Sequence, residues 1–122
     1  MKLRTRGNSI RMRLMQSEVK TLEQTAQVKD SVDFPGGEKL VYKLRISDRY
    51  DARLEDNSLT ISIPEPDAFR WIQTEEVGLE KSLDLPSGNR LNLLIEKDFN
   101  CLVDRPNEDE TDTFPNPSHE VC

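Results

Sequence analysis

The stretch GNSIRMRL at residues 7–14 returns in altered form as DNSLTISI at residues 56–63. In each copy a turn of small polar residues leads into alternating apolar and polar residues, which is the pattern of a β-hairpin. The same spacing of 49 residues aligns further polar and apolar positions downstream. We interpret these ordered matches as an internal duplication, with repeat 1 at about residues 3–47 and repeat 2 at about residues 52–96.

Each copy predicts the order strand, strand, helix, strand, strand. In the first copy these elements are expected at residues 2–6, 10–14, 16–26, 28–34 and 39–46. In the second copy they are expected at residues 52–55, 59–63, 64–74, 77–83 and 90–96. The sequence therefore predicts an α+β fold of internally duplicated strand-strand-helix-strand-strand units with two short helices. We expect mostly antiparallel strands in a curled sheet or a closed barrel, because closure removes exposed sheet edges. The sequence pattern does not distinguish a barrel from a two-layer sandwich.

Two residues of the expected helices carry specific predictions. Ser17 stands where the N-cap of the first helix is expected, since serine oxygens accept hydrogen bonds from the first turn. The single tryptophan, Trp71, aligns with the apolar Leu22 of the first copy. We therefore expect Trp71 to anchor the core rather than to stack on a ligand.

The composition is that of one globular domain with a distinct acidic end. The chain has 122 residues, of which 34% are apolar and 33% are charged, and this suffices for a modest single core. The apolar pattern fades after residue 96. We expect residues 1–96 to form the duplicated core and residues 97–122, an acidic tail with three of the seven prolines, to pack on the same domain.

No segment approaches the roughly 18 consecutive apolar residues of a membrane span. Residues 1–6 are basic, but no apolar run follows them to make a signal peptide. These observations predict a cytoplasmic protein without membrane contact. In that compartment Cys101 and Cys122 are expected to be reduced unless they bind a metal or take part in redox chemistry.

Positive charge gathers at the start of the chain. Residues 1–50 carry a net charge of +5, whereas residues 51–95 carry −5 and residues 96–122 carry −6. The first predicted hairpin places five basic residues on one side, and we call this set the basic face: Lys2, Arg4, Arg6, Arg11 and Arg13. Thr60 and Ser62 align with Arg11 and Arg13 in the second copy, so the shared fold does not require this charge.

Two uses of the basic face follow. In the first, the acidic tail lies across it as an internal electrostatic strap. In the second, the basic face receives an anionic ligand or a protein partner. The net charge of −6 and the absence of aromatic residues between the arginines favour the strap and disfavour nucleic acid as the partner.

The tail holds both cysteines and the single histidine. Cys101, His119 and Cys122 offer two thiolates and an imidazole, and Asp112 could supply a fourth ligand. Mixed sulfur and nitrogen coordination suits zinc first, and then iron or copper. The chain lacks a CxxC pair, which weakens the prediction. A Cys101–Cys122 disulfide is the alternative, although a reducing cytosol opposes it.

Signs of catalysis are sparse, because the chain contains no GxGxxG, GxxxxGK[ST] or GxSxG motif. We therefore predict a small non-enzymatic binding or accessory protein, with metal-ion binding by the tail as its most specific function. A metal-free protein- or anion-binding module that uses the basic face is the first alternative. A small enzyme with a cysteine or carboxylate site in the tail, such as a Cys101–His119 pair, is the second.

Both ends of the chain carry a family resemblance. The tail reads EKDFxCL at residues 96–102, then Arg105, then EDExDxFPNP at residues 108–117, and then Cys122. This run resembles the ending of a family of small bacterial proteins of unknown function, which also begin with a hairpin like GNSIR. The similarity spans most of the chain. It supplies no activity, and it implies only that the tail belongs to the domain.

Overall fold

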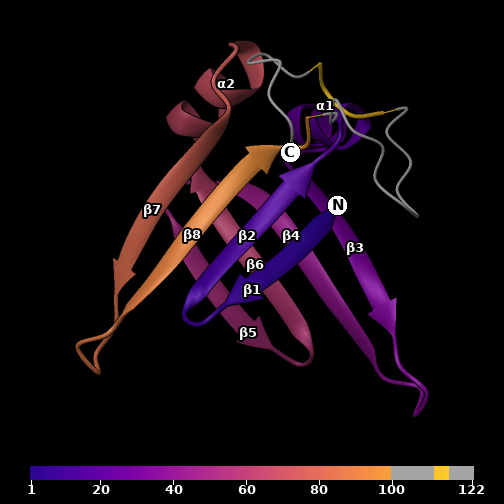
Figure 1. Ribbon diagram of the computed structural model, residues 1–122, viewed down its shortest axis with the longest axis vertical. Helices are drawn as coiled ribbons and strands as arrows, with labels where there is room; N and C mark the ends of the chain where they lie inside the picture. Colours follow the sequence, from indigo (N-terminus) through magenta and orange to yellow (C-terminus); the bar gives the residue numbers. More distant parts are fainter. Residues whose placement is uncertain (100–111, 116–122) are drawn as a thin grey trace.

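The computed structural model describes residues 1–99 and 112–115 of the chain (Figure 1). These residues form eight strands and two helices in this order: β1 (Lys2–Arg6), β2 (Ser9–Leu14), α1 (Gln16–Thr25), β3 (Gln27–Asp33), β4 (Lys39–Ser47), β5 (Asp51–Glu55), β6 (Ser58–Pro64), α2 (Glu65–Gln73), β7 (Gly78–Asp84) and β8 (Arg90–Lys97). The strands and helices follow the order predicted from the alternation and turn patterns and lie close to the predicted residue ranges, which confirms this part of the prediction.

The strands form two four-stranded sheets. Sheet A has the order β1-β2-β8-β7, and sheet B has the order β3-β4-β6-β5. Strands joined by a tight turn pair as antiparallel hairpins, whereas the two central pairs, β2 with β8 and β4 with β6, are parallel. Each sheet is therefore mixed, and each unites one hairpin from the first half of the chain with one from the second.

The predicted fold class is wrong. The protein is a sheet-rich assembly of two mixed sheets and not a pair of duplicated α+β units, because the two hairpins of each half belong to different sheets. It is also not a closed barrel, since β1, β7, β3 and β5 are outer strands in the described part of the chain. Hairpins depend on local turns, which the sequence displays. Which hairpin joins which sheet depends on packing between segments that are distant in the chain, and the sequence does not display this packing.

The two sheets enclose one core, and both helices lie at the end where the central strands finish (Figure 1). Trp71 of α2 is fully buried, and its ring nitrogen donates a hydrogen bond to the carbonyl oxygen of Val77 at 3.1 Å. This confirms the prediction that Trp71 is a core residue. The apolar side chains that are buried with it at 2% exposure or less come from both sheets and both helices: Met12, Leu14, Leu22, Leu44, Ile61, Ile63, Ala68, Leu93 and Ile95.

The ends of α1 are set by unusual caps. The helix begins at Gln16 after an extended Met15, so Ser17 lies within the first turn and is not the N-cap that the sequence predicts. At the other end Ala26 adopts a left-handed conformation with φ 64° and ψ 9°. Its N–H donates to the carbonyl of Leu22 at 2.9 Å, which completes the last turn. The chain then enters β3 directly.

Candidate functional site

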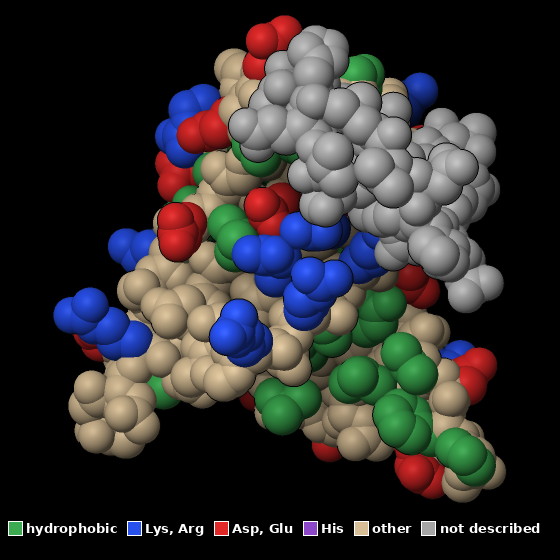
Figure 2. All heavy atoms as spheres, viewed as in Figure 1, with side chains coloured by type: hydrophobic (Ala, Val, Ile, Leu, Met, Phe, Trp, Pro, Cys, Tyr) green, Lys and Arg blue, Asp and Glu red, His purple; other side chains and the backbone are tan. Residues whose placement is uncertain are grey.

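The basic face is built by alternation along β1 and β2. In this antiparallel pair Lys2 lies opposite Arg13, and Arg4 lies opposite Arg11, so their side chains leave the same side of sheet A. Met12, between the two arginines of β2, points the other way and is fully buried. Figure 2 shows the resulting cluster of positive side chains in blue near the centre of the molecule.

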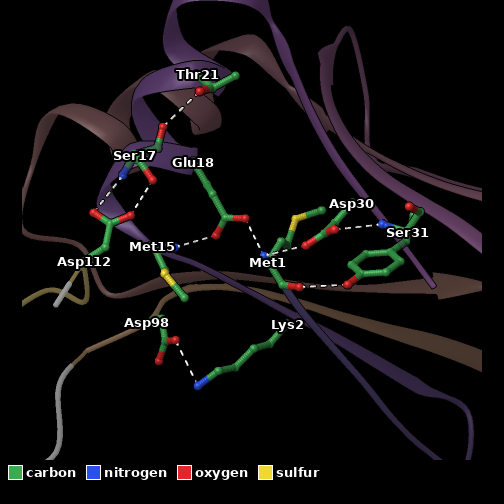
Figure 3. A network of polar contacts seen from close by, with 11 residues as sticks. Met1, Lys2, Met15, Ser17, Glu18, Thr21, Asp30, Ser31, Asp98 and Asp112 are labelled. Atoms are coloured by element: carbon green, nitrogen blue, oxygen red, sulfur yellow. Dashed lines mark hydrogen bonds and ion pairs between the residues drawn. The ribbon is translucent and has the colours of Figure 1, made fainter. Parts of the chain in front are cut away.

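Part of this charge is neutralised within the sheet. Glu96 of β8 lies opposite Arg13, and its Oε1 is 3.2 Å from Arg11 Nε and 3.4 Å from Arg13 Nε. Just past the end of β8, the side chain of Asp98 is buried, and its Oδ2 lies 3.1 Å from Lys2 Nζ (Figure 3). The end of the basic face nearest α1 is therefore paired with acids.

Arg4 and Arg6 have no carboxylate partner among residues 1–99 and 112–115. Together with Arg11 they line a cavity of about 390 Å³ on the outer side of sheet A, which we call the arginine groove. Ser9 and Asn92 line it as well, and the Asn92 amide donates to Ser9 Oγ at 3.4 Å. Guanidinium groups beside neutral hydrogen-bonding side chains are the combination that proteins use for phosphate and carboxylate groups.

The outer face of sheet B provides a contrast. It carries a cavity of about 360 Å³ that is lined by both arginines and acids. Arg53 Nε lies 3.0 Å from Asp51 Oδ2, and Arg53 Nη1 lies 3.7 Å from Glu55 Oε1. The hydrogen bond from Arg53 lowers the pKa of Asp51. Arg53 of this cavity is thus paired with acids, whereas the arginine groove combines three arginines with one acid, Glu80, among its described lining residues.

The amino group of Met1 holds the start of β1 in a second polar cluster (Figure 3). It is buried and forms ion pairs with Glu18 of α1 and with Asp30 of β3, the latter at 3.1 Å. The hydroxyl of Tyr42 donates to the carbonyl oxygen of Met1 at 2.9 Å. Burial alone would lower the pKa of the amino group, but the hydrogen bonds and charges of the two carboxylates outweigh it, so this pKa is raised. The cluster ties sheet A to α1 and sheet B.

Asp112, one of the four predicted metal ligands, lies at the first turn of α1. Its Oδ1 accepts a hydrogen bond from the Ser17 N–H at 3.3 Å, and its Oδ2 accepts one from the Ser17 hydroxyl. Its carbonyl oxygen accepts a third from the Gln16 N–H at 3.0 Å. The positive end of the helix dipole favours a carboxylate at this position. Asp112 therefore supplies the capping group that the sequence assigns to Ser17.

The other three predicted ligands, Cys101, His119 and Cys122, lie outside the described residues. Within the described part of the chain, no group of three His, Cys, Asp or Glu side chains is arranged to hold a metal ion. Zinc binding by the tail thus stays a prediction from the sequence.

Lys97, at the end of β8, is buried between residues 112–115 and the end of α2. Its Nζ donates to the carbonyl oxygen of Thr74 at 2.6 Å and lies 5.9 Å from the centroid of the Trp71 ring and 5.8 Å from that of Phe114. Burial lowers the pKa of Lys97, against the opposing charge of nearby glutamates. The rings of Phe99 and Phe114 meet edge to face with centroids 5.8 Å apart. These contacts join residues 112–115 to the end of sheet A.

Sequence reasoning did not find Glu96, the acid that partners Arg11 and Arg13 of the basic face. Glu96 alternates with apolar residues in a predicted strand, which indicates an outward position. Its place beside Arg11 and Arg13 follows only from the parallel pairing of β2 with β8. Glu18 and Asp30 were missed for the same reason, because Met1 meets them only in the folded chain.

The fold and the face together define a small protein of two mixed sheets with a basic outer surface, on which Arg4 and Arg6 form no ion pair with another described residue. The chain belongs to a family of unknown function, DUF7009, whose family model matches residues 1–118. This confirms the resemblance to a family of unknown function. The comparison with curated proteins found no match, and no solved structure matches the chain. In the described part of the chain, neither helix has the length and apolar character needed to cross a membrane.

Proposed function

We propose that this protein is a binding module for anionic groups and that its ligand site is the arginine groove. The observation that supports this is the pair of arginines, Arg4 and Arg6, without a carboxylate partner in the described part of the chain. Arg4 also lies opposite Arg11, and like charges directly opposite each other across two strands destabilise a sheet. A bound anion would relieve this repulsion.

The lining of the groove indicates which anions it suits. A guanidinium group donates two parallel hydrogen bonds to carboxylate or phosphate, and three such groups surround a cavity of about 390 Å³. Ser9 and Asn92 add groups that both donate and accept. Because Arg4 and Arg6 are exposed, salt would screen the interaction, so we expect modest affinity that falls as ionic strength rises.

The strap is the competing use of the basic face. Of the two acidic tail residues that the structure describes, Asp112 contacts α1, whereas Asp98 pairs with Lys2 of the basic face, outside the arginine groove. The acids at residues 108–110 lie outside the described residues. The strap therefore needs its own test. Replacing these three acids by their amides lowers stability and strengthens anion binding if the tail occupies the basic face, and changes neither if the arginine groove is open.

The experiment titrates the protein with inorganic pyrophosphate and with a peptide of six glutamates, by calorimetry at low salt. The double variant R4S/R6S is expected to lose at least about tenfold in affinity for both probes, which corresponds to about 1.4 kcal/mol. The matched control is K29S/K43S, which removes two opposing positive charges from the outer face of sheet B. Equal losses in both double variants, or no binding by the wild-type protein, would exclude the arginine groove as the site.

Metal binding through Cys101, His119, Cys122 and Asp112 stays a second proposal that rests on the sequence alone. The contacts of Asp112 with Ser17 speak for a structural use of that carboxylate. Elemental analysis of protein purified without an affinity tag tests the proposal. Zinc at one ion per chain, together with a loss of stability on addition of a chelator, would support it.

A further inference from the structure

The open edge of sheet A carries the basic face. β1 is an outer strand, and in the described part of the chain no backbone hydrogen bond joins residues 3–6 to a strand other than β2. In such a strand every second residue directs its backbone N–H and C=O groups away from the sheet, where another strand can pair with them. The edge is therefore a template for an added strand.

This edge starts above sheet B. Met1 contacts Asp30 of β3 and Tyr42 of β4, two residues that lie opposite each other. From this point β1 and β3 run apart toward their hairpin turns (Figure 1). The next pair of inward residues on sheet B toward the turn is Val32 and Leu40. A strand added beside β1 would occupy the space above this pair.

Sheet B carries exposed apolar side chains there. Val32 and Phe34 are 44% and 47% exposed, although Val32 belongs to the inward face of the sheet. Phe34 and Leu40 line a cavity of about 240 Å³. We call Val32, Phe34 and Leu40 the apolar patch. In Figure 2 apolar side chains form a green area directly beside the blue cluster of the basic face. Exposed apolar area next to charge is typical of a surface that binds another protein.

We propose that the partner is an extended protein segment with alternating acidic and apolar residues, which joins sheet A as a new strand beside β1. This inference rests on the proposed function and identifies the anions as carboxylates of a peptide. Facing sheets lie about 10 Å apart, so every second side chain of the new strand would reach the apolar patch. The side chains between them would emerge beside Lys2, Arg4 and Arg6.

The charge pattern argues against a second copy of the chain as the occupant. Pairing β1 with β1 of another copy would bring two rows of positive side chains together, which destabilises the contact. The other outer strand of sheet A, β7, carries the acidic Glu80 and Asp84. Its inward face includes Lys81, opposite Leu93, and this charge would be placed on the apolar patch. A separate acidic and apolar segment meets neither obstacle.

The test uses a synthetic seven-residue peptide that alternates glutamate with valine or leucine. Two peptide controls have the same composition: one has its glutamates grouped together, and the other has N-methyl groups on alternate backbone amides, which prevents strand pairing. We expect the alternating peptide to bind at least about tenfold more tightly than either control. We also expect it to slow hydrogen exchange at the amides of β1.

Protein variants distinguish binding at the apolar patch from binding at the arginine groove. V32S/F34S is expected to weaken binding of the alternating peptide by about tenfold and to leave pyrophosphate binding unchanged. L54S is the matched control, since Leu54 is 73% exposed on the opposite outer strand of sheet B. Equal binding of all three peptides, together with loss of pyrophosphate binding in R4S/R6S, would overturn the added strand and leave the anion site intact. Failure of every peptide and of pyrophosphate to bind would overturn both. Assembly of the protein through β1 in the absence of peptide would also overturn the inference.

Discussion

Arg4 lies directly opposite Arg11 across the β1–β2 pair, and sheet B has a matching arrangement in which Lys29 lies opposite Lys43. Both pairs bring like charges together on an outer face. They differ in their surroundings, because Arg4 lines a cavity together with Arg6 and Arg11, whereas neither lysine is among the residues that line the outer cavity of sheet B. Of the two pairs, the one in sheet A is therefore the one that borders a cavity with further positive charge.

The first prediction concerns how much the repulsion between Arg4 and Arg11 lowers the stability of the fold. R4T should raise the free energy of unfolding by about 0.2–0.5 kcal/mol at low salt, because it removes a cross-strand repulsion, and should weaken pyrophosphate binding. The gain in stability should shrink as salt is added. Urea denaturation at two salt concentrations measures it. K29T is the control, with a similar gain and unchanged binding. A loss of more than about 1 kcal/mol in R4T would show that Arg4 supports the fold instead.

The second prediction concerns the amino group of Met1. E18Q should lower the free energy of unfolding by about 1–2 kcal/mol at pH 6, because it removes one partner of a buried charge. The pKa of this amino group is raised above 8.0, so its pairing stabilises the fold fully below pH 8.0 and ceases to do so as the pH rises through the folded-state value. The difference between wild type and E18Q should therefore shrink in alkaline solution.

Asp30 determines how the stability contributed by the same cluster changes at acid pH. Burial would raise the pKa of Asp30, but hydrogen bonds from the Ser31 N–H and the Met1 amino group lower it below 3.8. Its share of the stability is present above pH 3.8 and is lost as the pH falls further. D33N is the control for both measurements, since Asp33 is 81% exposed and pairs only across the surface. A pH-independent effect of E18Q would contradict the assigned ion pair.

The third prediction concerns the contact of the tail with α1. S17A and D112A should each lower the free energy of unfolding by about 1 kcal/mol, because each removes a group that satisfies the first turn of the helix. A double-mutant cycle should show a coupling of about 0.5–1 kcal/mol between them. T21A, one turn further along α1, should be additive with D112A. Additivity of S17A with D112A would mean that the tail does not cap the helix.

The fourth prediction concerns Ala26, which ends α1 in a left-handed conformation at φ 64°. A26G should raise the free energy of unfolding by about 0.5–1 kcal/mol, because glycine adopts this conformation without the steric cost of a β-carbon. A68G is the matched control: the same substitution inside α2 should lower stability by about 1 kcal/mol or more. Thermal melts of both variants show whether each substitution raises or lowers stability. A loss of stability in A26G would show that another contact of the alanine methyl outweighs the strain.

Part of the candidate site could be predicted from the residues alone. Alternation along residues 2–14 was enough to place the five basic side chains on one side, because side chains of a strand alternate with a period of two. The local pattern also predicted the turns within the hairpins and the burial of Trp71. In contrast, Asp112 was predicted as a metal ligand because acids near cysteines suggest one. Its contact with Ser17 arises from packing of the tail on α1.

The sequence by itself determined the order and approximate positions of the strands and helices, and which side of each strand is apolar, since these properties depend on residues close together in the chain. The tertiary structure alone decided that β8 lies beside β2, that Glu96 neutralises Arg11 and Arg13, and that Arg4 and Arg6 are left without an acid in the described part of the chain. The physical reason is that the pairing of hairpins maximises burial across two sheets, and any of several pairings would satisfy the local pattern equally well.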